Sequence, residues 1–557
     1  MTYLQLQEKQ IWISLRTKGD MELDQYMEND VNVSVLSFKI KKHKFSFIVK
    51  VQSLFEFQVK SILLRGRERS EELCLTFNIK KQSSKEVVLC VTLDLDELKP
   101  GPIYWDFYMA IAIGKKVQCV QIKNPVLLVL VKLSSRFYSI VKEGKLYYPY
   151  IATQRTISLC VRPVHQYDGV TYIFKELMAI LLHCVIGGRL RRKKIWLIYE
   201  KFCETAQDNS FYFFKYCYEN SDKTNVYYVI KKDSKDFKYV EPYKSKVISF
   251  MSIKHILYML NCELVISSES KTHGYIWREN RGIIRRVFNK KKHVFLQHGV
   301  IGLKRVDSLF HKRSANETKL FIVSSEFEKA LVEENLHYSS EEIAVTGLAR
   351  WDHVPVSKNN DLKQILLFPT WRSWLDEVDR KGFINSTYYK KYSELLASEQ
   401  LKWLLETHNI ILKCCLHPKF REHTDAFKKV WHKKIEIITY EDERIIDLIH
   451  NSNLLITDYS SIAWDMFYLG KPVIFYQFDI EEYMRYQGSY LDPEELFGDR
   501  YDRADELVEG LEEYVKRGFK EQGHYSVLRS KYFSYSDLNN CERIYNAIVT
   551  LMKNTLK

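Results

Sequence analysis

The sequence lacks the short signatures that mark many nucleotide, metal and nucleic-acid sites. It has no glycine-rich dinucleotide fingerprint, no phosphate-binding P-loop, no HExxH zinc motif and no serine nucleophile elbow. Its basic residues cluster in places, but they are not interleaved with aromatic residues in any RNA-binding pattern. These absences exclude the commonest motif-defined enzyme classes and argue against a nucleic-acid partner.

Paired cysteines and long apolar runs are also missing. The 11 cysteines form no CxxC pair and no zinc-ligand spacing. An odd number of cysteines without a disulfide framework is typical of a reducing cytoplasm. The first residues, MTYLQLQEKQIWISLR, contain no continuous hydrophobic region, so no signal peptide is expected. No window is expected to supply the ~18 apolar residues of a membrane span.

The most apolar stretch, residues 177–186, is short, contains His183 and runs into a basic cluster at residues 189–194. An apolar helix that ends in cations suits an anionic membrane surface, and it equally suits a buried helix at the start of a domain. The net charge of +14 favours acidic partners. The combination predicts a cytoplasmic protein that is peripheral on the inner face of the cell membrane.

Hydrophobic periodicity divides the 557 residues into three parts. From about residue 33 to 165 apolar and polar residues alternate in short runs, as in Val87, Leu89, Val91, Leu93 and Leu95. Strict alternation between turns predicts an N-terminal antiparallel β-sandwich over residues 1–165.

Beyond residue 190 the pattern changes to short apolar strands separated by helical stretches. This α/β pattern predicts two doubly wound, Rossmann-like halves of GT-B type over residues 166–355 and 356–557, the second ending in a helix at 541–556. Ligands of such sheets bind at the carboxyl ends of the strands. The predicted strands are 194–202, 226–230, 264–268, 293–299 and 320–325 in the first half, and 364–370, 410–418, 435–440, 454–458 and 472–478 in the second.

Residues 454–479 are the most informative segment. They indicate a buried strand, a polar turn with Asp458, Ser460 and Ser461, a short helix and a second buried strand. Either serine can N-cap the helix, whose unpaired amides and partial positive charge suit a diphosphate. An ordinary capped helix in an α/β domain is the alternative interpretation.

Further polar residues follow strand ends in both halves. In the first half His298 and Gly299 close a strand, with Lys304 a little further on. In the second half His417 is followed by Pro418 and Lys419, and another strand ends on Thr370, Trp371 and Arg372. Two histidines at strand ends in opposing halves, together with cations, predict a cleft that handles phosphate.

These segments resemble the CDP-glycerol glycerophosphotransferase family, the polymerases and primases of teichoic acid and related phosphate-containing capsules. Two positions depart from the family pattern, because Gln297 and Val300 stand where members often carry tryptophan and threonine. The resemblance covers about residues 195–540 and uses His298, Gly299 and Lys304, then Gly347, Arg350 and Asp352, then residues 369–372, His417 with Pro418, and residues 457–461.

The resemblance implies transfer of glycerol phosphate or ribitol phosphate from a CDP-alditol to a hydroxyl of a lipid-linked glycan or polyol-phosphate acceptor, with release of CMP. It implies His298 as general base and His417 as stabiliser of the transferring phosphoryl group. No metal site is expected, which leaves magnesium to arrive with the substrate diphosphate. The remaining implied roles are donor binding by Thr370, Trp371, Arg372, Lys419, Ser460 and Ser461, turn orientation by Asp458, and support from Gly299, Lys304, Arg350 and Asp352.

Several alternatives stay open at this stage. Arg350 and Asp352 can form a simple inter-strand ion pair, and Asp465 can be a solvated helix residue. A sugar-nucleotide glycosyltransferase of the same architecture would release a nucleoside diphosphate instead of CMP. A module that only binds anionic polymer would need no histidine at position 298. Glycerol or ribitol, teichoic acid or capsule, and the oligomeric state are left undecided.

Overall fold

The computed structural model describes residues 31–554 except 42, 68–71, 99–103, 115, 123–138, 153–155, 221–224, 278–282, 315–316, 354–362, 376–377, 379, 418–419, 421–422, 428–431 and 441. The chain divides into two compact units. The first comprises the described residues up to Gly169, and the second comprises Val170–Trp277 and Ile283–Lys557. Each unit is described by itself.

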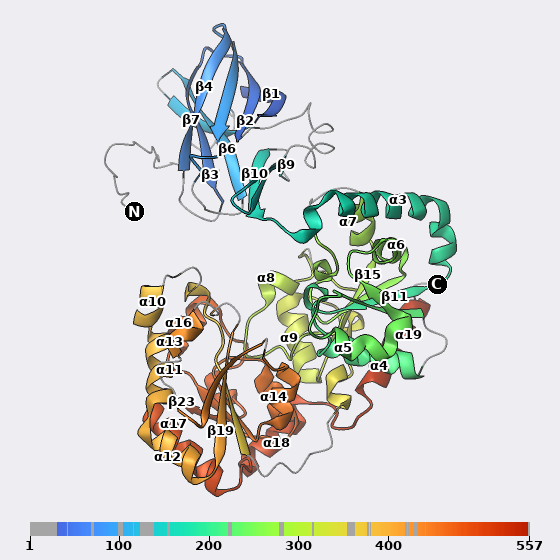
Figure 1. The fold of residues 1–557 in the computed structure, drawn as a ribbon, viewed down its shortest axis with the longest axis vertical. Coiled ribbons are helices and arrows are strands. Elements are labelled where there is room, and N and C mark those ends of the chain that lie inside the picture. Colours follow the sequence, from blue (N-terminus) through green and yellow to red (C-terminus); the bar gives the residue numbers. More distant parts are fainter. Residues whose placement is uncertain are drawn as a thin grey trace. The chain divides into compact units, whose positions relative to one another are not determined.

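The first unit is an antiparallel sheet of ten strands (Figure 1). Nine of them follow the order β1-β2-β5-β4-β3-β6-β10-β9-β8, and β7 pairs with β6. The strands are β1 (Val31–Lys41), β2 (Lys44–Ser53), β3 (Gln58–Gly66), β4 (Glu72–Gln82), β5 (Glu86–Asp94), β6 (Tyr104–Ile113), β7 (Lys116–Gln121), β8 (Ile140–Lys142), β9 (Lys145–Ile151) and β10 (Ile157–Pro163).

This sheet folds over on itself around one core. Along β5 the alternate residues Val87, Leu89, Val91 and Leu93 are buried, as the sequence pattern predicts. Phe47 of β2 and Phe107 of β6, which are far apart in the strand order, meet edge to face with ring centroids 5.1 Å apart. The antiparallel prediction is confirmed, but the facing layers belong to one hydrogen-bonded sheet. Alternation shows which face is buried and carries no information about strand order.

The second unit begins with a parallel sheet of seven strands in the order β13-β12-β11-β14-β15-β16-β17. Its strands are β11 (Ile195–Tyr199), β12 (Asn225–Ile230), β13 (Val247–Ser249), β14 (Leu264–Ser267), β15 (Lys292–Phe295), β16 (Leu320–Val323) and β17 (Ile343–Val345). The helices of this part are α3 (Val170–Arg191), α4 (Asn209–Asn220), α5 (Phe237–Val240), α6 (Ile253–Asn261), α7 (Ile283–Asn289), α8 (Asp307–Phe310) and α9 (Glu326–Leu336).

A second parallel sheet of six strands follows, in the order β20-β19-β18-β21-β22-β23. Its strands are β18 (Lys363–Phe368), β19 (Ile410–Leu416), β20 (Ile435–Thr439), β21 (Leu454–Thr457), β22 (Val473–Tyr476) and β23 (Asp499–Tyr501). The remaining helices are α10 (Arg380–Asn385), α11 (Thr387–Ala397), α12 (Glu399–Thr407), α13 (Thr424–Phe427), α14 (Ile445–Asn451), α15 (Ile462–Tyr468), α16 (Ile480–Tyr486), α17 (Ala504–Lys516), α18 (Gly523–Tyr532) and α19 (Asn540–Asn554).

Both parallel sheets reverse their strand order at the centre, between β11 and β14 and between β18 and β21. Such a reversal opens a crevice at the carboxyl ends of the strands, and all the predicted site residues follow strands of these sheets. The predicted strands are confirmed. Strands β13, β17 and β23 were not predicted, because three residues each are too few to show a periodic pattern.

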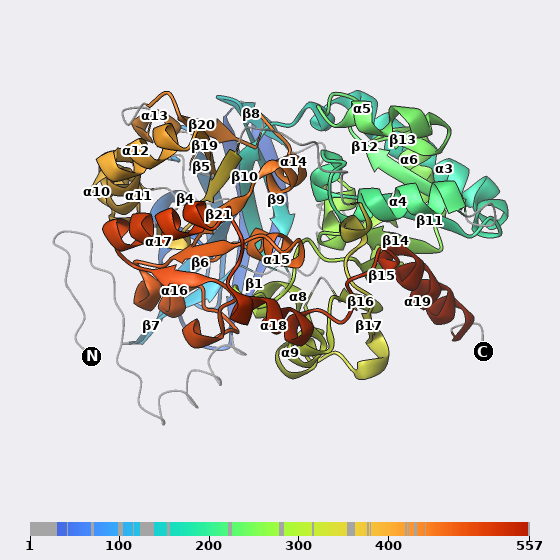
Figure 2. The same ribbon diagram turned by 90° about the horizontal axis from the view of Figure 1, so that it is seen from below.

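Helix α19 returns to the first parallel sheet (Figure 2). Its residues Cys541, Ile544 and Ile548 are buried in the core formed with β11, β12 and β14, and Tyr545 lies against Trp196 with ring centroids 5.9 Å apart. Sequence analysis assigned this helix to the second half. The difference arises because helical periodicity reveals an apolar face without revealing which sheet it covers.

Helix α3 is longer than the apolar stretch found in the sequence. It spans 22 residues and contains an 18-residue window with a mean hydropathy of 1.6, which makes it long and apolar enough to cross a membrane by length and composition. The expectation that no window reaches this length was therefore wrong. One face, with Glu176, Ala179, Gly187 and Leu190, is buried, and α3 packs against α6 (Figure 1).

Candidate functional site

The loop after β15 presents His298. Gln297 adopts a left-handed backbone with φ of 63°, which is uncommon for a residue other than glycine. Its buried side-chain amide donates to the Ile322 carbonyl at 2.6 Å and to Glu328 Oε1 at 2.9 Å. The next side chain, His298, is 65% exposed. Gln297, one of the two departures from the family pattern, is therefore a loop anchor with its side chain inside the protein.

His298 is oriented by carboxylates. Its Nδ1 lies 2.5 Å from Asp208 Oδ2 and 3.9 Å from Glu269 Oε1. A carboxylate only accepts, so Nδ1 carries a proton, and in the neutral form of the ring Nε2 can accept one. Desolvation lowers the pKa of His298, but the charge and hydrogen bond of Asp208 outweigh it and raise the pKa to about 9. This is the arrangement of a positioned general base.

Asp208 sits at the start of α4, directly beneath His298. Its Oδ1 accepts from Arg350 Nη1 at 2.8 Å and from the Asn209 amide at 2.7 Å. Burial raises the pKa of the Asp208 carboxyl, but the charges of His298 and Arg350 outweigh this and keep the pKa below its ordinary value. Asp208 is thereby held as an anion beside the histidine.

Glu200, which directly follows β11, is buried beneath the segment that carries Asp208 and holds this segment in place. Its carboxylate accepts from the amides of Gln207 at 3.1 Å, Asp208 at 2.8 Å and Phe211 at 3.0 Å. Burial raises the pKa of Glu200 to about 7, and the Asp208 charge adds to the rise. The loop that carries Asp208 is therefore fixed by buried hydrogen bonds.

Arg350 joins the two halves of the site. Its Nε and Nη2 each donate to the Asp465 carboxylate at 2.8 Å, and its Nη1 reaches both Asp208 and the His298 carbonyl, the latter at 2.7 Å. Asp465 lies on α15, is only 3% exposed and also accepts from Trp351 Nε1 at 2.8 Å. The interpretation of Asp465 as a solvated helix residue is therefore wrong.

Asp352 has a different partner from the one considered. Its carboxylate accepts from the Asn540 amide at 2.9 Å, from Asn540 Nδ2 at 2.7 Å and from the Cys541 amide at 2.6 Å. These contacts begin α19, whose first amides have no partner within the helix. Asp352 thus ties the C-terminal helix to the first sheet, and the proposed ion pair with Arg350 is replaced by the Arg350–Asp465 pair.

The loop of His298 touches α15 at two glycines. A Cβ on Gly299 would lie 2.8 Å from Ser461 Oγ, and one on Gly302 would lie 2.6 Å from Trp464 Cζ2. Ser461 occupies the N-cap position of α15 without a capping bond from its side chain, and the Ile462 amide reaches Ser460 Oγ only at 3.5 Å. The turn with the two serines therefore lies directly against the loop of the candidate base.

Arg372 and Asp458 form a buried network behind this turn. Arg372 is fully buried and donates to Asp479 at 2.7 and 3.0 Å and to the Thr370 carbonyl at 2.8 Å, while its Nη1 lies 2.8 Å from Asp458 Oδ2. Asp458 also accepts from the Thr370 amide at 2.9 Å and from Tyr392 at 2.8 Å. Direct phosphate binding by Arg372 does not fit this arrangement. The pair instead holds the loop and the turn together.

A second cluster brings together residues that follow strands of both parallel sheets. The rings of Trp371 and His417 are stacked with centroids 6.2 Å apart, and Lys304 Nζ of the first half lies 5.7 Å from the Trp371 ring. The Thr370 backbone is tied to Asp458, and its buried hydroxyl makes no hydrogen bond. Lys419 lies outside the described residues.

Sequence analysis missed Asp208, Glu200 and Glu269. A signal was present, because the polar run that ends in Asp208 and Asn209 follows a buried strand and starts a helix. In the part of the chain that the structure describes, no group of three or more His, Cys, Asp or Glu is placed to hold a metal.

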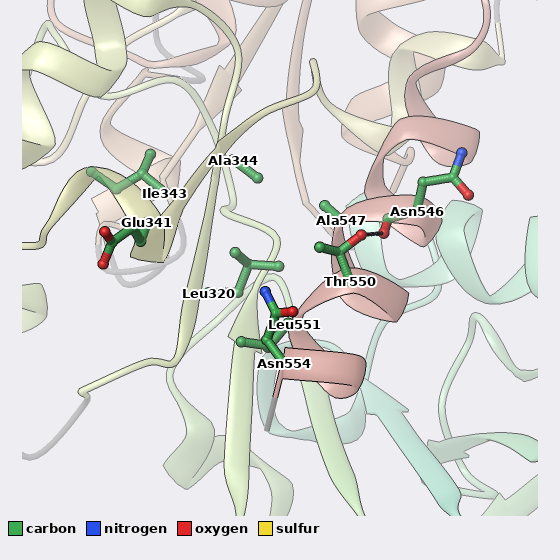
Figure 3. Close-up of a pocket in the computed structure, with 9 residues that line it drawn as sticks. All are labelled: Leu320, Glu341, Ile343, Ala344, Asn546, Ala547, Thr550, Leu551 and Asn554. Carbon is green, nitrogen blue, oxygen red and sulfur yellow. Dashed lines mark hydrogen bonds between the residues drawn. The ribbon is translucent and has the colours of Figure 1, made fainter. Parts of the chain in front are cut away.

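A pocket of about 350 Å³ lies elsewhere, between α19 and strands β16 and β17 (Figure 3). Its lining is mostly aliphatic and amide side chains and includes none of the residues described above. The lining residues are Leu320, Glu341, Ile343, Ala344, Asn546, Ala547, Thr550, Leu551 and Asn554.

The chain is similar to proteins of teichoic acid synthesis. The chain is 33% identical over 398 residues to the minor teichoic acid biosynthesis protein GgaB of Bacillus subtilis (strain 168), a match that covers 69% of this chain and 42% of GgaB. It is 25% identical over 256 residues to a teichoic acid glycerol-phosphate transferase of Staphylococcus aureus (strain NCTC 8325 / PS 47), with 42% of this chain and 62% of the relative covered. The chain thus spans less than two thirds of either relative.

Among solved structures, the wall teichoic acid polymerase TagF aligns with 70% of this chain and 100% of its own, at 15% identity and a TM-score of 0.47. The family model described as CDP-Glycerol:Poly(glycerophosphate) glycerophosphotransferase matches residues 180–550. That range takes in both parallel sheets and the cluster around His298, so the chain belongs to the CDP-glycerol:poly(glycerophosphate) glycerophosphotransferase family.

Proposed function

We propose that this protein transfers glycerol phosphate or ribitol phosphate from a CDP-alditol to a hydroxyl of a lipid-linked or polymeric acceptor and releases CMP, in teichoic acid or capsule synthesis. Family membership and the names of the relatives support the reaction class. The observation that carries the proposal is the placement of His298. A carboxylate-oriented histidine of the first half lies next to the Ser460–Ser461 turn of the second.

His298 acts as the general base in this reaction. Its Nε2 takes the proton of the acceptor hydroxyl while that oxygen forms a bond to the β-phosphorus of the donor. The bond between the β-phosphorus and the oxygen bridging to CMP breaks, and CMP leaves with the electron pair. Asp208 stabilises the imidazolium that forms, as an adjacent carboxylate does in other histidine bases.

Charge stabilisation is assigned to the facing cluster. His417 and Lys304 both lie close to Trp371 and are proposed to contact the transferring phosphoryl group and the leaving phosphate. Lys419 is proposed as a further cation there. Phosphoryl transfer depends mostly on positioning and electrostatic stabilisation, so these contacts supply the larger part of the catalytic effect.

The second parallel sheet is proposed to bind the donor. The hydroxyls of Thr370, Ser460 and Ser461 and the positive end of the α15 dipole would hold the diphosphate, and Trp371 would stack on cytosine. Arg372 and Asp458 act from inside by fixing the turn. We further propose that the two sheets form a GT-B-type pair, with the donor on the second and the acceptor on the first.

We also propose that α3 places the protein on an anionic membrane. The exposed face of α3 carries Val170, Phe174, Leu177, Leu181 and Val185, a spacing that aligns them along one side. The opposite face packs on α6, and the helix runs into an exposed basic cluster at 189–194. An apolar face followed by cations favours a helix lying in the membrane plane, where a lipid-linked acceptor would be within reach.

The test is nucleotide release by the purified full-length chain supplied with CDP-glycerol or CDP-ribitol and a lipid-linked acceptor analogue. CMP release with one donor is expected, together with its loss in His298→Ala. His524→Ala, which removes an exposed histidine of α18, is the matched control and should keep full activity. UDP from UDP-sugars, with no CMP from either donor, would overturn the proposal in favour of glycosyl transfer.

A further inference from the structure

A line of side chains leads away from His298 along the carboxyl edge of the first parallel sheet. Glu269 Oε1 lies 3.9 Å from His298 Nδ1, and Glu269 Oε2 lies 3.9 Å from His273 Nδ1. The His273 ring is stacked on Phe202, with centroids 4.2 Å apart and the planes inclined by 27°. These side chains follow one another in the order His298, Glu269, His273 and Phe202. None of the roles proposed above involves the last three.

The backbone places the Phe202 ring at the surface. Phe202 and Cys203 both adopt left-handed conformations, with φ of 50° and 55°. Two consecutive non-glycine residues in that region are strained, and such strain concentrates at functional sites. The turn buries Cys203 and leaves Phe202 46% exposed. A phenylalanine that served only the core would be buried instead.

The segment after β11, which carries Phe202, is held against the segment after β14, which carries His273. Tyr199, the last residue of β11, donates from its hydroxyl to the Lys271 carbonyl at 2.6 Å. A Cβ on Gly274 would lie 2.5 Å from the Tyr199 ring, so only glycine allows this approach. The Cys203 thiol also contacts the His273 carbonyl at 3.7 Å. The Phe202–His273 stack is therefore a preorganised surface.

We propose that Phe202, His273 and Glu269 form a subsite for a pyranose ring of the acceptor. The flat C–H face of a pyranose stacks on an exposed aromatic ring, while a carboxylate and an imidazole hydrogen-bond its hydroxyls. An open-chain alditol has no such face, so the surface favours a ring sugar. Its assignment to the acceptor rests on the proposed function, because the subsite adjoins His298 in the sheet opposite the proposed donor site.

Binding is tested without turnover, by saturation-transfer NMR on the full-length chain with methyl β-glucopyranoside, N,N′-diacetylchitobiose and glycerol as probes. Transfer to pyranose C–H protons is expected and should exceed transfer to glycerol. It should fall severalfold in Phe202→Ala and in Phe202→Gly, which retains the left-handed turn, and return in Phe202→Tyr. Trp403→Ala, which removes a ring 55% exposed on α12, is the control and should match the wild type.

Several outcomes would overturn the subsite. They are equal signals in wild type and Phe202→Ala, transfer to glycerol as strong as to the pyranosides, or no transfer to either pyranoside. Displacement of the pyranoside by CDP-glycerol would place the sugar in the donor site and would also refute the proposal.

Acceptor kinetics supply a second test. With CMP release as readout, kcat/KM is compared for an acceptor that bears a pyranose and for one that lacks it. Phe202→Ala should lower the ratio of the two values by about tenfold, the effect of one lost aromatic stack. An unchanged ratio would refute the acceptor assignment. Absence of CMP release from the wild type would refute the proposed reaction, and the NMR result would still decide the subsite.

Discussion

At the residue scale the proposed chemistry is concentrated in one histidine and the charges that hold it. Asp208 fixes the ring of His298 through Nδ1, and Arg350 binds both Asp208 and the His298 carbonyl. The orientation of one imidazole therefore depends on three elements of the chain. Changes at these partners should alter the pH dependence of the reaction as well as its rate.

Asp208→Asn should shift the pH profile to lower pH. The pKa of His298 is raised to about 9, so the reactive neutral imidazole accumulates and kcat/KM rises as pH approaches that value. Without the Asp208 charge the pKa falls, and the rising limb moves to lower pH. Loss of orientation should also reduce kcat by ~100-fold.

The measurement is kcat/KM for CMP release between pH 6 and 10. Glu269→Gln, which removes the more distant carboxylate, serves as comparison. It should also move the rising limb of the pH profile to lower pH, but by less than Asp208→Asn does. A limb at the same pH in Asp208→Asn and wild type would show that Asp208 does not set the protonation of the base.

Asp465→Asn should destabilise the second unit. It weakens a buried pair and leaves the Arg350 charge partly uncompensated, which typically lowers the free energy of unfolding by ~3 kcal/mol. Asp447→Asn is the control, since Asp447 is 41% exposed in its pair with Arg444 and should change the free energy of unfolding by less than ~1 kcal/mol. Urea unfolding measures both, and equal effects would contradict the structural role of Asp465.

At the scale of elements, α3 has two faces with different surroundings. The face that packs on α6 includes Glu176, whose carboxylate accepts from the Tyr275 hydroxyl, and His183, whose Nδ1 lies 2.9 Å from Asn261 Oδ1. The other face is exposed and apolar. A helix that packs on protein along one side and exposes an apolar face along the other fits the position in the membrane plane proposed above.

Val185→Asp should weaken membrane binding. Val185 is 72% exposed in the apolar face, and a carboxylate there adds both a desolvation penalty and repulsion from anionic lipid. Vesicle sedimentation with phosphatidylglycerol should show at least a ~10-fold loss of binding. Val527→Asp on α18, at 70% exposure, is the matched control and should bind as wild type does. Equal loss in both variants would refute a specific role for α3.

At the scale of the whole second unit, the two parallel sheets meet through the His298 loop, α15 and α19. The contacts are a charge pair at Arg350 and Asp465 and close approaches at Gly299 and Gly302. The proposed base and the proposed diphosphate turn therefore depend on one interface. A change that separates the sheets slightly should impair catalysis without touching either group.

Gly302→Ala tests this dependence. Its Cβ would lie 2.6 Å from the Trp464 ring, so the loop must shift, and activity is expected to fall ~10-fold with a loss of stability of ~1–3 kcal/mol. Trp464→Phe removes the atom in conflict. The double variant should therefore be more stable and active than the sum of the single effects predicts, with a coupling energy of ~1 kcal/mol or more. Additive effects in urea unfolding would contradict the close approach.

Most of the site residues that the sequence predicted lie at the ends of strands. His298, His417 and the Ser460–Ser461 turn follow buried apolar strands, and local patterns determine such strands because burial on both faces requires continuous apolar residues. The short strands β13, β17 and β23 were beyond this signal. The sequence also could not show which sheet α19 packs against, because an apolar stripe predicts that a helix face is buried without specifying its partner.

The sequence by itself determined an antiparallel N-terminal unit, two parallel sheets and the family, since each depends on residues close together in the chain. Only the tertiary structure decided that Asp208 holds His298, that Arg350 pairs with Asp465 and that Arg372 faces inward. These contacts join residues about 90 to 142 positions apart. Charge pairing over such separations is decided by which loops the folded sheets bring to a common edge, and local periodicity carries no record of that.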